Sequence, residues 1–451
     1  MTSLMKIAFI TAGAAGMYCG SCLRDNALAR ALVAKGHEVI LVPTYTPTRT
    51  DEPNQSIHRV FLGGINLYLQ HKSALFRHTP WATDRVLDSP TLLNWVSRFA
   101  VKTDAADLGA LTVSMLQGET GPDRKEFRKL ANWLREEVRP DIVDLSNSML
   151  IGLAATLRSE LGVPVVCSLS GEDLFLEGLP KPWHGQALDL LRRRAMDVNG
   201  FITFSHSYAN FMKEYLQIGA DRLHQVPLGI SLEGYDDSDD TPASAGEVSV
   251  DQQESQRFRI GYLARICPEK GLHLLLEAFR DLRTDPRFGG ASLQVAGYLG
   301  ARDRRYWREL CRQVEDWGLT GSVEFAGELD RAAKIRFLRA LDVFSVPTVY
   351  REAKGLPVLE AWASRVPVVQ PWHGSFTELV NATQGGLLVP PNDPKALADA
   401  IGQLLENPGL RKELGQRGRQ AVERQFTAEH MATSTLSVYT NVLREHTAGN
   451  K

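Results

Sequence analysis

The sequence predicts an α/β protein made of two Rossmann-like domains that face each other across a cleft. Its 451 residues are more than one ordinary hydrophobic core supports. In both halves, short apolar runs rich in β-branched residues alternate with helical stretches, which is typical of a parallel sheet with helical crossovers. Between the halves, residues 236–256 are acidic and serine-rich without a hydrophobic period, which is typical of a linker.

Each half contains six predicted strands. In the first half they cover 6–11, 37–43, 141–145, 164–169, 200–204 and 224–227. In the second half they cover 258–263, 292–296, 323–325, 343–346, 367–370 and 386–389. Helices are predicted at 23–35, 272–282, 302–317 and 426–443, the first ending at Lys35-Gly36 because glycine commonly follows a last helical turn. The resulting boundaries are 1–235 for the N-terminal domain, 236–256 for the linker, 257–425 for the C-terminal domain and 426–451 for a C-terminal segment.

A stretch near 66–120 interrupts this alternation. It contains helical segments rich in tryptophan and phenylalanine and no predicted strand. An insertion of this kind on an α/β domain usually shapes a substrate site or covers a sheet edge. We expect a helical cap packed on the N-terminal domain. Its basic amphipathic pieces leave contact with a membrane surface as the alternative.

Composition excludes several classes of protein. Lys plus Arg number 51 against 53 for Asp plus Glu, a net charge of −2. Nucleic-acid binders normally carry a dominant basic field, so no nucleic-acid partner is expected. No apolar run approaches the roughly 20 residues that span a bilayer, and the start lacks the layout of a signal peptide. The five cysteines form no disulfide framework for a chain of this size, which suits a reducing cytosol.

A pair of carboxylates marks the strongest candidate site. Glu352 and Glu360 lie eight positions apart, with Gly355 and Pro357 between them. Proline is well placed at the first helical position, so a helix is predicted to begin near Leu356. The free N–H groups at its start would form an anion site suited to a diphosphate. Glu360 would then lie about one turn into the helix, and Glu352 on the loop before it.

This segment resembles the E-x7-E motif of the family-4 retaining glycosyltransferases, which have the GT-B fold. Four further parts of the chain resemble motifs of this family, in the same order. They are Val226-Pro-Leu-Gly-Ile230, Gly261-Tyr-Leu-Ala-Arg265-Ile-Cys-Pro-Glu-Lys270-Gly271, Val366-Pro-Val-Val369 followed by Gly374-Ser-Phe-Thr-Glu378, and Gly385-Gly-Leu-Leu-Val-Pro-Pro-Asn-Asp393. The resemblance covers nearly the whole C-terminal domain and, more loosely, the N-terminal domain.

The resemblance implies a hexosyltransferase that moves a hexose from a nucleotide-sugar donor to a glycan, lipid or small-molecule acceptor with retention of configuration. The C-terminal domain would bind the donor and the N-terminal domain the acceptor, and the C-terminal helix would cross back to the N-terminal domain. No metal or cofactor is expected, because Arg265, Lys270 and the helix near Leu356 would stabilise the leaving diphosphate. The expected location is the cytosol, with peripheral contact to the inner membrane as an alternative.

The resemblance also assigns residues to the donor side. Glu352 would lie at the catalytic centre, near the transferred sugar, and Glu360 would reach the ribose. The expected donor-binding residues are Arg265, Lys270, Glu360, Gly355, Leu356, Pro357 and Val358.

The loop after the first strand resembles the family's glycine-rich loop beside donor and acceptor. It contains Gly13, Gly16 and Gly20, and glycines let a backbone approach a ligand. Their spacing is not G-x-G-x-x-G, so dinucleotide binding is not predicted. Cys19 and Cys22 in the same loop have the C-x-x-C spacing of redox and metal sites. No second cysteine pair or nearby histidine cluster accompanies them, so the sequence favours neither.

The acceptor side departs from the family pattern. Where many members have a histidine, this chain has Asp144 and Ser146, and a following H-D pair is replaced by Glu172-Asp173. Glu172 or Asp173 could supply an acid in place of the histidine. Asp173 could equally cap the start of a helix. His206, after a strand end, is a further candidate on this side.

Two other functions remain open from the sequence. A nucleotide-sugar epimerase or hydrolase on the same scaffold would turn over its substrate without an acceptor. An inactive, glycosyltransferase-like binding protein is suggested by the missing histidine. The intact Glu352, Glu360, Arg265 and Lys270 favour an active enzyme.

Overall fold

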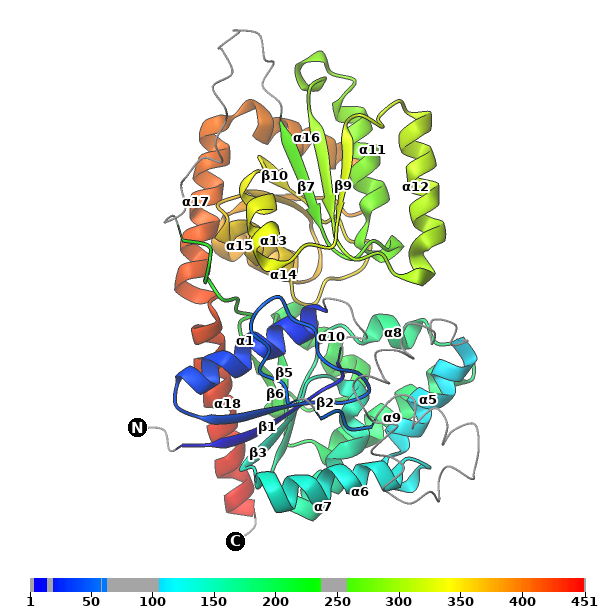
Figure 1. Cartoon of the computed structure of the whole chain (residues 1–451), viewed down its shortest axis with the longest axis vertical. Helices are drawn as coiled ribbons and strands as arrows, with labels where there is room; N and C mark the ends of the chain where they lie inside the picture. The colour runs from blue at the N-terminus through cyan, green and yellow to red at the C-terminus, as the bar shows by residue number, and fades with distance from the viewer. Residues whose placement is uncertain (1–3, 14–18, 58, 63–104, 237–257, 450–451) are drawn as a thin grey trace. The chain divides into compact units, whose positions relative to one another are not determined.

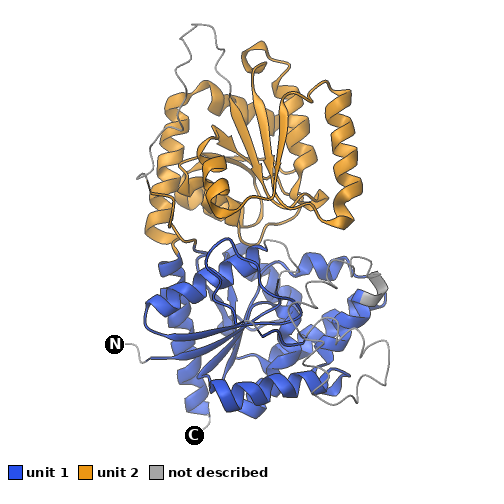
Figure 2. Cartoon of the chain, viewed as in Figure 1, with its two compact units in different colours: residues 1–229, 428–451 blue, residues 230–427 orange. Residues whose placement is uncertain are grey.

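The computed structural model describes residues 4–13, 19–57, 59–62, 105–236 and 258–449. The chain forms two compact units, shown in Figure 2. Unit 1 comprises Met1–Gly229 and Ala428–Lys451, and unit 2 comprises Ile230–Thr427. Each unit is built on a six-stranded parallel sheet with helices on both sides (Figure 1). The predicted α/β class is therefore confirmed.

The sheet of unit 1 has the strand order β2-β1-β3-β4-β5-β6. Its strands are β1 Lys6–Thr11, β2 Glu38–Pro43, β3 Ile142–Leu145, β4 Val165–Ser168, β5 Gly200–Thr203 and β6 Leu223–Gln225. All six predicted strands are confirmed, with small shifts at their ends. Every residue of β3, β4 and β5 is buried, because helices cover both faces of a parallel sheet.

Eight α-helices in the described part of unit 1 surround this sheet. They are α1 Gly20–Ala34, α5 Ala105–Gln117, α6 Arg124–Trp133, α7 Ala154–Leu161, α8 Asp173–Glu177, α9 Trp183–Arg194, α10 His206–Leu216 and α18 Ala428–Gly449. The last helix, α18, packs against α1. The chain therefore returns at its end to the unit in which it began.

Helix α5 is the described part of the predicted insertion. It packs against α9, and the close approach depends on Gly109, where a Cβ atom would lie 2.4 Å from Cγ of Trp183. Residues 66–104, which include those that suggested membrane contact, lie outside the described residues. Of the helices that the structure describes, none is long and apolar enough to cross a membrane.

The sheet of unit 2 has the order β12-β11-β10-β7-β8-β9. Its strands are β7 Arg259–Leu263, β8 Ser292–Ala296, β9 Val323–Gly327, β10 Val343–Phe344, β11 Val368–Pro371 and β12 Gly386–Val389. Its helices are α11 Leu272–Leu282, α12 Arg304–Asp316, α13 Arg331–Arg339, α14 Leu356–Ala363, α15 Gly374–Thr383, α16 Pro394–Glu406 and α17 Pro408–Gln425. All six predicted strands are again confirmed, although β10 is shorter than expected.

Both sheets reverse their strand order beside their first strand. β1 lies between β2 and β3, and β7 lies between β8 and β10. In open parallel sheets a crevice forms at such a point, outside the carboxyl ends of the strands, and ligands bind there. The loops that follow β1 and β3 in unit 1, and β7 and β10 in unit 2, are therefore the places to search for a site.

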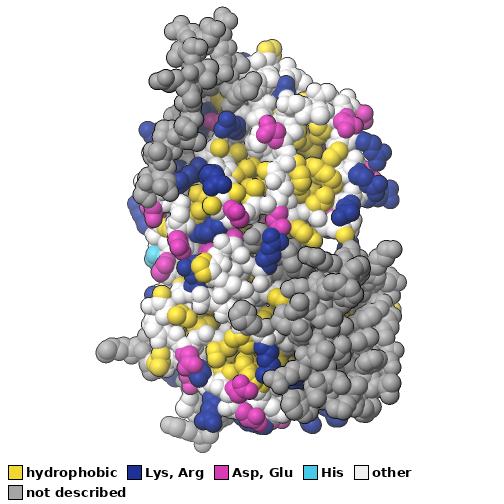
Figure 3. All heavy atoms as spheres, in the orientation of Figure 1, with side chains coloured by type: hydrophobic (Ala, Val, Ile, Leu, Met, Phe, Trp, Pro, Cys, Tyr) yellow, Lys and Arg dark blue, Asp and Glu magenta, His cyan; other side chains and the backbone are white. Residues whose placement is uncertain are grey.

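The surface carries charges of both signs. In the view of Figure 3, lysine and arginine side chains are interspersed with aspartate and glutamate over the described residues, without a field of one sign. This distribution agrees with the net charge of −2.

Candidate active site

Glu352 is the centre of a buried hydrogen-bond cluster in unit 2. It lies on the loop after β10 and is 7% exposed. Lys270 Nζ lies 2.6 Å from Glu352 Oε2, and the hydroxyl of Tyr350 donates to the same oxygen at 2.7 Å. Lys270 also donates to the Tyr350 hydroxyl at 2.5 Å. The backbone N–H groups of Lys354 and Gly355 donate to Oε1 at 3.2 and 3.4 Å. Three of the expected site residues, Glu352, Lys270 and Gly355, thus lie together.

These contacts keep Glu352 ionised. Burial alone would favour the neutral acid, but the Lys270 ammonium and the Tyr350 hydroxyl lower the pKa of Glu352 to about 2. Burial also disfavours the charge of Lys270, and the neighbouring Glu352 and Tyr350 nevertheless raise the pKa of its ammonium. A buried charge is stable only when it is paired and hydrogen-bonded. At neutral pH the site therefore holds one fixed positive and one fixed negative charge.

Two glycines of the predicted motifs allow the backbone to pack closely around Glu352. Gly374 begins α15 with φ of 57°, and a Cβ atom there would lie 2.5 Å from the carbonyl oxygen of Glu352. The N–H of Ser375 donates to that carbonyl at 2.8 Å. Gly355 has φ of 77°, and a Cβ atom there would lie 2.4 Å from Leu379 Cδ1. At both positions the backbone has a positive φ and a Cβ atom would clash with a neighbour, so both positions require glycine.

Helix α14 begins at Leu356, as predicted. Pro357 is its second residue rather than its first. An N–H at this position would have no intrahelical partner, so proline, which has no N–H, costs the helix no hydrogen bond there. Gly355 is the N-cap, and its carbonyl accepts from the N–H of Val358 at 3.0 Å. The positive end of the helix dipole therefore lies directly after the Glu352 loop, a position that favours an anionic ligand.

Glu360 lies in the fifth position of α14 and is 7% exposed. Its Oε1 forms an ion pair with Nζ of Lys334, a buried lysine of α13. The two glutamates of the motif are therefore each paired with a different lysine. Neither is the solvated surface acid that an isolated glutamate usually is.

Arg265 follows β7 and lies on the loop that leads to Lys270. Its side chain is exposed, and its Nε donates to Cys267 Sγ at 3.3 Å. Lys270 is held differently, within the Glu352 cluster. Arg265 and Lys270, the two residues expected to bind the diphosphate, thus lie on one loop at the carboxyl end of β7, where the strand order reverses.

A second buried cluster lies at the carboxyl ends of the strands of unit 1, around Arg24 of α1. Arg24 is 1% exposed. Its Nε donates to Asp25 Oδ1 at 2.8 Å, and a terminal nitrogen donates to the carbonyl of Ser146 at 3.0 Å. Another terminal nitrogen donates to the hydroxyl of Ser170, while Thr11 Oγ1 donates to Asp25 Oδ2 at 2.9 Å. One guanidinium thereby joins α1, the end of β3 and the loop after β4.

The loop after β4 carries the two predicted acids. Glu172 Oε2 accepts the backbone N–H of Ser170 at 2.8 Å. Asp173 is the first residue of α8, not the N-cap residue before it, and its Oδ1 accepts the hydroxyl of Tyr208 at 2.7 Å. Burial raises the pKa of Asp173, and the Tyr208 hydroxyl opposes this shift. Whether either acid takes part in the reaction stays a prediction.

The remaining acceptor-side candidates are more scattered. Gly13 has φ of 81° and lies so close to Thr46 that a Cβ atom would approach the Thr46 carbonyl oxygen to 2.0 Å. Gly20 is the first residue of α1, and Gly16 lies outside the described residues. Ser146 is buried and contributes its carbonyl to the Arg24 cluster. His206 is exposed at the first position of α10.

Asp144, which stands where the family often has a histidine, is fully buried on β3. Its Oδ2 accepts the hydroxyl of Tyr439 of α18 at 2.6 Å, and its Oδ1 has no hydrogen-bond partner among the described residues. Burial, with a contribution from Asp25, raises the pKa of Asp144 to about 7, although Tyr439 and Arg24 oppose the shift. Asp144 therefore anchors the C-terminal helix instead of presenting an acid to a ligand.

Stability should consequently depend on the protonation of Asp144. Between its ordinary pKa of 3.8 and about 7, the folded chain keeps a proton that the unfolded chain releases, so stability falls as the pH rises through this range. We expect Asp144→Asn to be more stable than the wild type at pH 8 by about 2–4 kcal/mol, with the difference vanishing near pH 4. Denaturant unfolding of both proteins at several pH values measures this. A difference that does not change with pH would contradict the assignment.

Tyr350, Lys334 and Arg24 are among the residues of these clusters that had no role in the sequence interpretation. Tyr350 could have been found from its place two residues before Glu352. Arg24 and Asp25 are adjacent opposite charges in α1, but the contacts of Arg24 with Ser146 and Ser170 join segments 122 and 146 positions apart. Lys334 lies in no motif, and only the packing of α13 beside α14 brings it to Glu360.

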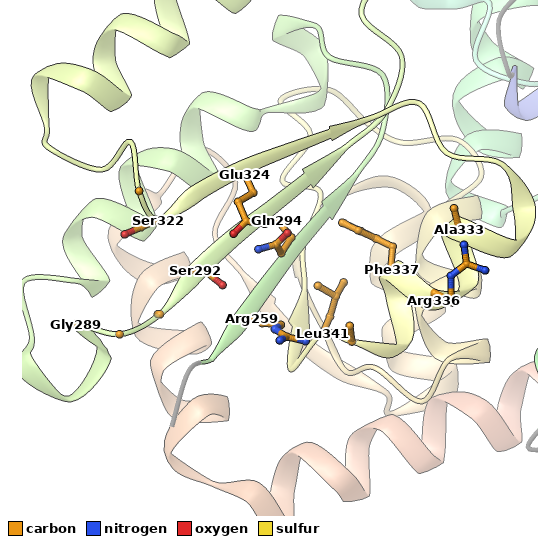
Figure 4. Close-up of a pocket in the computed structure, with 14 residues that line it drawn as sticks. Arg259, Gly289, Ser292, Gln294, Ser322, Glu324, Ala333, Arg336, Phe337 and Leu341 are labelled. Atoms are coloured by element: carbon orange, nitrogen blue, oxygen red, sulfur yellow. The ribbon is translucent and has the colours of Figure 1, made fainter. Parts of the chain in front are cut away.

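A pocket of about 630 Å³ lies elsewhere in unit 2. It lies beside the first residues of β7 and β8 and the start of β9, opposite α13, and Figure 4 shows Arg259, Ser292 and Ser322 on the strand side. These positions are at the amino ends of the strands, whereas the Glu352 cluster is at the carboxyl ends. The pocket is therefore separate from the candidate active site. Among the described residues, no group of three or more His, Cys, Asp or Glu side chains could hold a metal ion.

Comparisons with known proteins agree with the geometry. Residues 25–229 match the family described as "Glycosyl transferase 4-like domain", and residues 248–421 match "Glycosyl transferases group 1". The glycogen synthase of Mycobacterium tuberculosis is 31% identical over 308 residues, which are 67% of this chain and 69% of that protein. The phosphatidyl-myo-inositol mannosyltransferase of Mycobacterium leprae is 27% identical over 282 residues, 61% of this chain and 64% of the mannosyltransferase.

Solved structures show the same fold. Sucrose-phosphate synthase of Thermosynechococcus elongatus superposes with a TM-score of 0.71 at 19% identity, covering 97% of this chain and 99% of the other. The Anabaena protein HepE, solved with UDP and glucose, superposes with a TM-score of 0.65 at 17% identity over the same shares of the two chains. The predicted family and fold are thus confirmed, and the chain belongs to the group 1 glycosyltransferases with the GT-B fold.

Proposed function

We propose that this glycosyltransferase transfers a hexose from a nucleotide-sugar donor to a saccharide or lipid-linked acceptor, with retention of anomeric configuration. The observation that carries the proposal is the buried Lys270–Tyr350–Glu352 cluster, which directly precedes the N-terminus of α14. The structure of HepE with UDP and glucose supports the donor class. The mannosyltransferase and glycogen synthase relatives support a saccharide or lipid-linked acceptor.

In this proposal the donor diphosphate binds between the Arg265–Lys270 loop and the first turn of α14. The negative charge that develops on the leaving diphosphate would be stabilised by Arg265, by Lys270 and by the backbone N–H groups of α14. Three fixed sources of positive potential can do this without a bound metal, and no cofactor is required. Glu352 would then lie beside the sugar, and Glu360 further along α14 beside the ribose.

The acceptor would be held by unit 1, at the carboxyl ends of β1, β3 and β4. Glu172 and Asp173 remain the candidates there for an acid that contacts the acceptor. A cytosolic location, with peripheral contact to the inner membrane if the acceptor is a lipid, belongs to the same proposal.

Donor binding tests the proposal first. We expect one class among UDP-, GDP-, ADP- and TDP-hexoses to raise the melting temperature, because a ligand at ~100 times its Kd stabilises by about 2.7 kcal/mol. Arg265→Gln should lose most of this shift, whereas Arg312→Gln, an exposed arginine of α12, should keep it. The anomeric configuration of the product, determined by NMR, then tests retention. A full shift in Arg265→Gln, or no shift with any donor, would overturn the donor site.

A further inference from the structure

Cys19 and Cys22 lie together on the first turn of α1. Cys19 is the N-cap residue, and its carbonyl accepts the first helical bond, from the N–H of Leu23 at 2.9 Å. Residues three apart on one helical turn are neighbours on its surface. Both cysteines are reduced in the structure. The pair follows β1 in a β1-α1-β2 crossover, and C-x-x-C in that context is typical of thiol–disulfide exchange sites.

The two thiols differ in their surroundings. Cys19 is partly accessible, whereas Cys22 is 2% exposed. A hydrogen bond to Cys19, followed by burial, raises the pKa of the Cys22 thiol. Reactive cysteines are accessible and often lie at helix N-termini, whereas buried cysteines react slowly. The accessible cysteine is thus arranged as the nucleophile and the buried one as the resolving thiol.

We infer that Cys19 and Cys22 form a reversible thiol–disulfide exchange site at the start of α1. The inference is independent of the proposed transferase reaction. A metal site is the other use of this spacing, but structural zinc takes four ligands, and the described residues supply no cluster of three or more. The geometry therefore favours the disulfide.

The reaction uses a small-molecule disulfide as oxidant. The Cys19 thiolate attacks one sulfur of that disulfide, its S–S bond breaks, and one thiol leaves with a proton from solvent. Cys22, after losing its proton to solvent, attacks the Cys19 sulfur of the mixed disulfide and releases the second thiol. The products are the Cys19–Cys22 disulfide and two small thiols, so the small disulfide gains the two electrons that the protein loses.

The pair is connected to the Arg24 cluster of unit 1. The Asp25 carboxylate contributes to the raised pKa of the Cys22 thiol, and Asp25 is bound by Arg24, which also holds Ser146 and Ser170. A change at Cys22 therefore acts directly on the residues that arrange the carboxyl ends of β1, β3 and β4.

Thiol trapping on the full folded chain tests the inference. The protein is equilibrated in mixtures of reduced and oxidised glutathione, then alkylated and digested with trypsin. The tryptic peptide 7–24 contains Cys19 and Cys22 and no other cysteine, so the disulfide appears as a peptide that lacks two alkyl groups. We expect one sharp transition between doubly alkylated and internally bridged peptide as the mixture becomes more oxidising.

Single substitutions separate the roles of the two thiols. Cys22→Ser should accumulate glutathione on Cys19, because no resolving thiol remains. Cys19→Ser should leave Cys22 reacting at least roughly tenfold more slowly, since that thiol is buried. Cys311→Ser, on α12 of unit 2, should behave as the wild type. The inference is overturned if the wild-type peptide stays doubly alkylated in every mixture, or if it only collects glutathione without forming the bridge.

Discussion

Replacing Glu352 by glutamine is expected to lower sugar transfer by on the order of 10²–10³-fold, while nucleotide affinity changes by no more than a few-fold. Glutamine keeps the shape of the side chain, and its oxygen can still accept hydrogen bonds from Lys270 and Tyr350. Its NH2 group would face the N–H groups of Lys354 and Gly355, so only the two long bonds of 3.2 and 3.4 Å are lost. It removes the negative charge that the cluster holds by lowering the pKa of Glu352 to about 2. In the proposed function this charge lies beside the sugar, where positive charge develops as the glycosidic bond breaks.

The measurement is the release of nucleoside diphosphate from the donor class found by binding, with and without acceptors. Alanine is a poorer choice at this position, because it would remove the accepting oxygen as well as the charge and leave both the buried Lys270 ammonium and the Tyr350 hydroxyl without an acceptor, at a cost of about 3–5 kcal/mol. Tyr350→Phe should give a smaller loss, since it removes two hydrogen bonds but no charge. Glu315→Gln, a surface change on α12, is the control. Wild-type rates in Glu352→Gln would remove Glu352 from the catalytic centre.

The architecture could be predicted from the sequence because its signals are local. The central strands, such as β3 and β4, are short apolar runs that are buried on both faces, and helical stretches separate the runs. The placement of Glu352, Gly355 and the start of α14 was predictable for the same reason. Gly355 and Gly374 pack against specific neighbours, so the spacing of the motif reflects the geometry of one loop and two helix starts.

Buried polar clusters that depend on contacts between distant segments could not be predicted in this way, and they occur in both units. From the sequence, Asp144 is only an aspartate in a predicted strand. In the structure it accepts a hydrogen bond from the hydroxyl of Tyr439, which lies 295 positions away. The sequence around Glu360 is typical of an exposed acid on a helix. In the structure, α13 places Lys334 beside Glu360, and the two form a buried ion pair. A charged group can be buried only where the fold supplies a partner for it. The periodic pattern of apolar residues in a helix or strand does not show which partner that will be.

Arg24 is the clearest such case, and its replacement is expected to have the largest effect on stability. Arg24→Met should lower the free energy of unfolding of unit 1 by about 3–5 kcal/mol, because it leaves the buried Asp25 carboxylate without the guanidinium. It also removes the donors to the Ser146 carbonyl and the Ser170 hydroxyl. Lysine should not restore stability, since a single ammonium cannot reproduce the planar set of donors that contacts three residues at once.

A double-mutant cycle separates the charge pair from a loss of packing. If the cost comes from an unneutralised Asp25, then Arg24→Met combined with Asp25→Asn should be less destabilised than the sum of the two single variants, by about 1–3 kcal/mol. The matched control is Arg135→Met, which breaks an ion pair with Glu160 at 2.6 Å on the surface of the same unit and should cost about 0–1 kcal/mol. Additive single effects in calorimetric unfolding would show that Arg24 stabilises through packing alone. A strong coupling would instead establish that one buried charge pair fixes the positions of α1 and of the loops after β3 and β4, on which the proposed acceptor side depends.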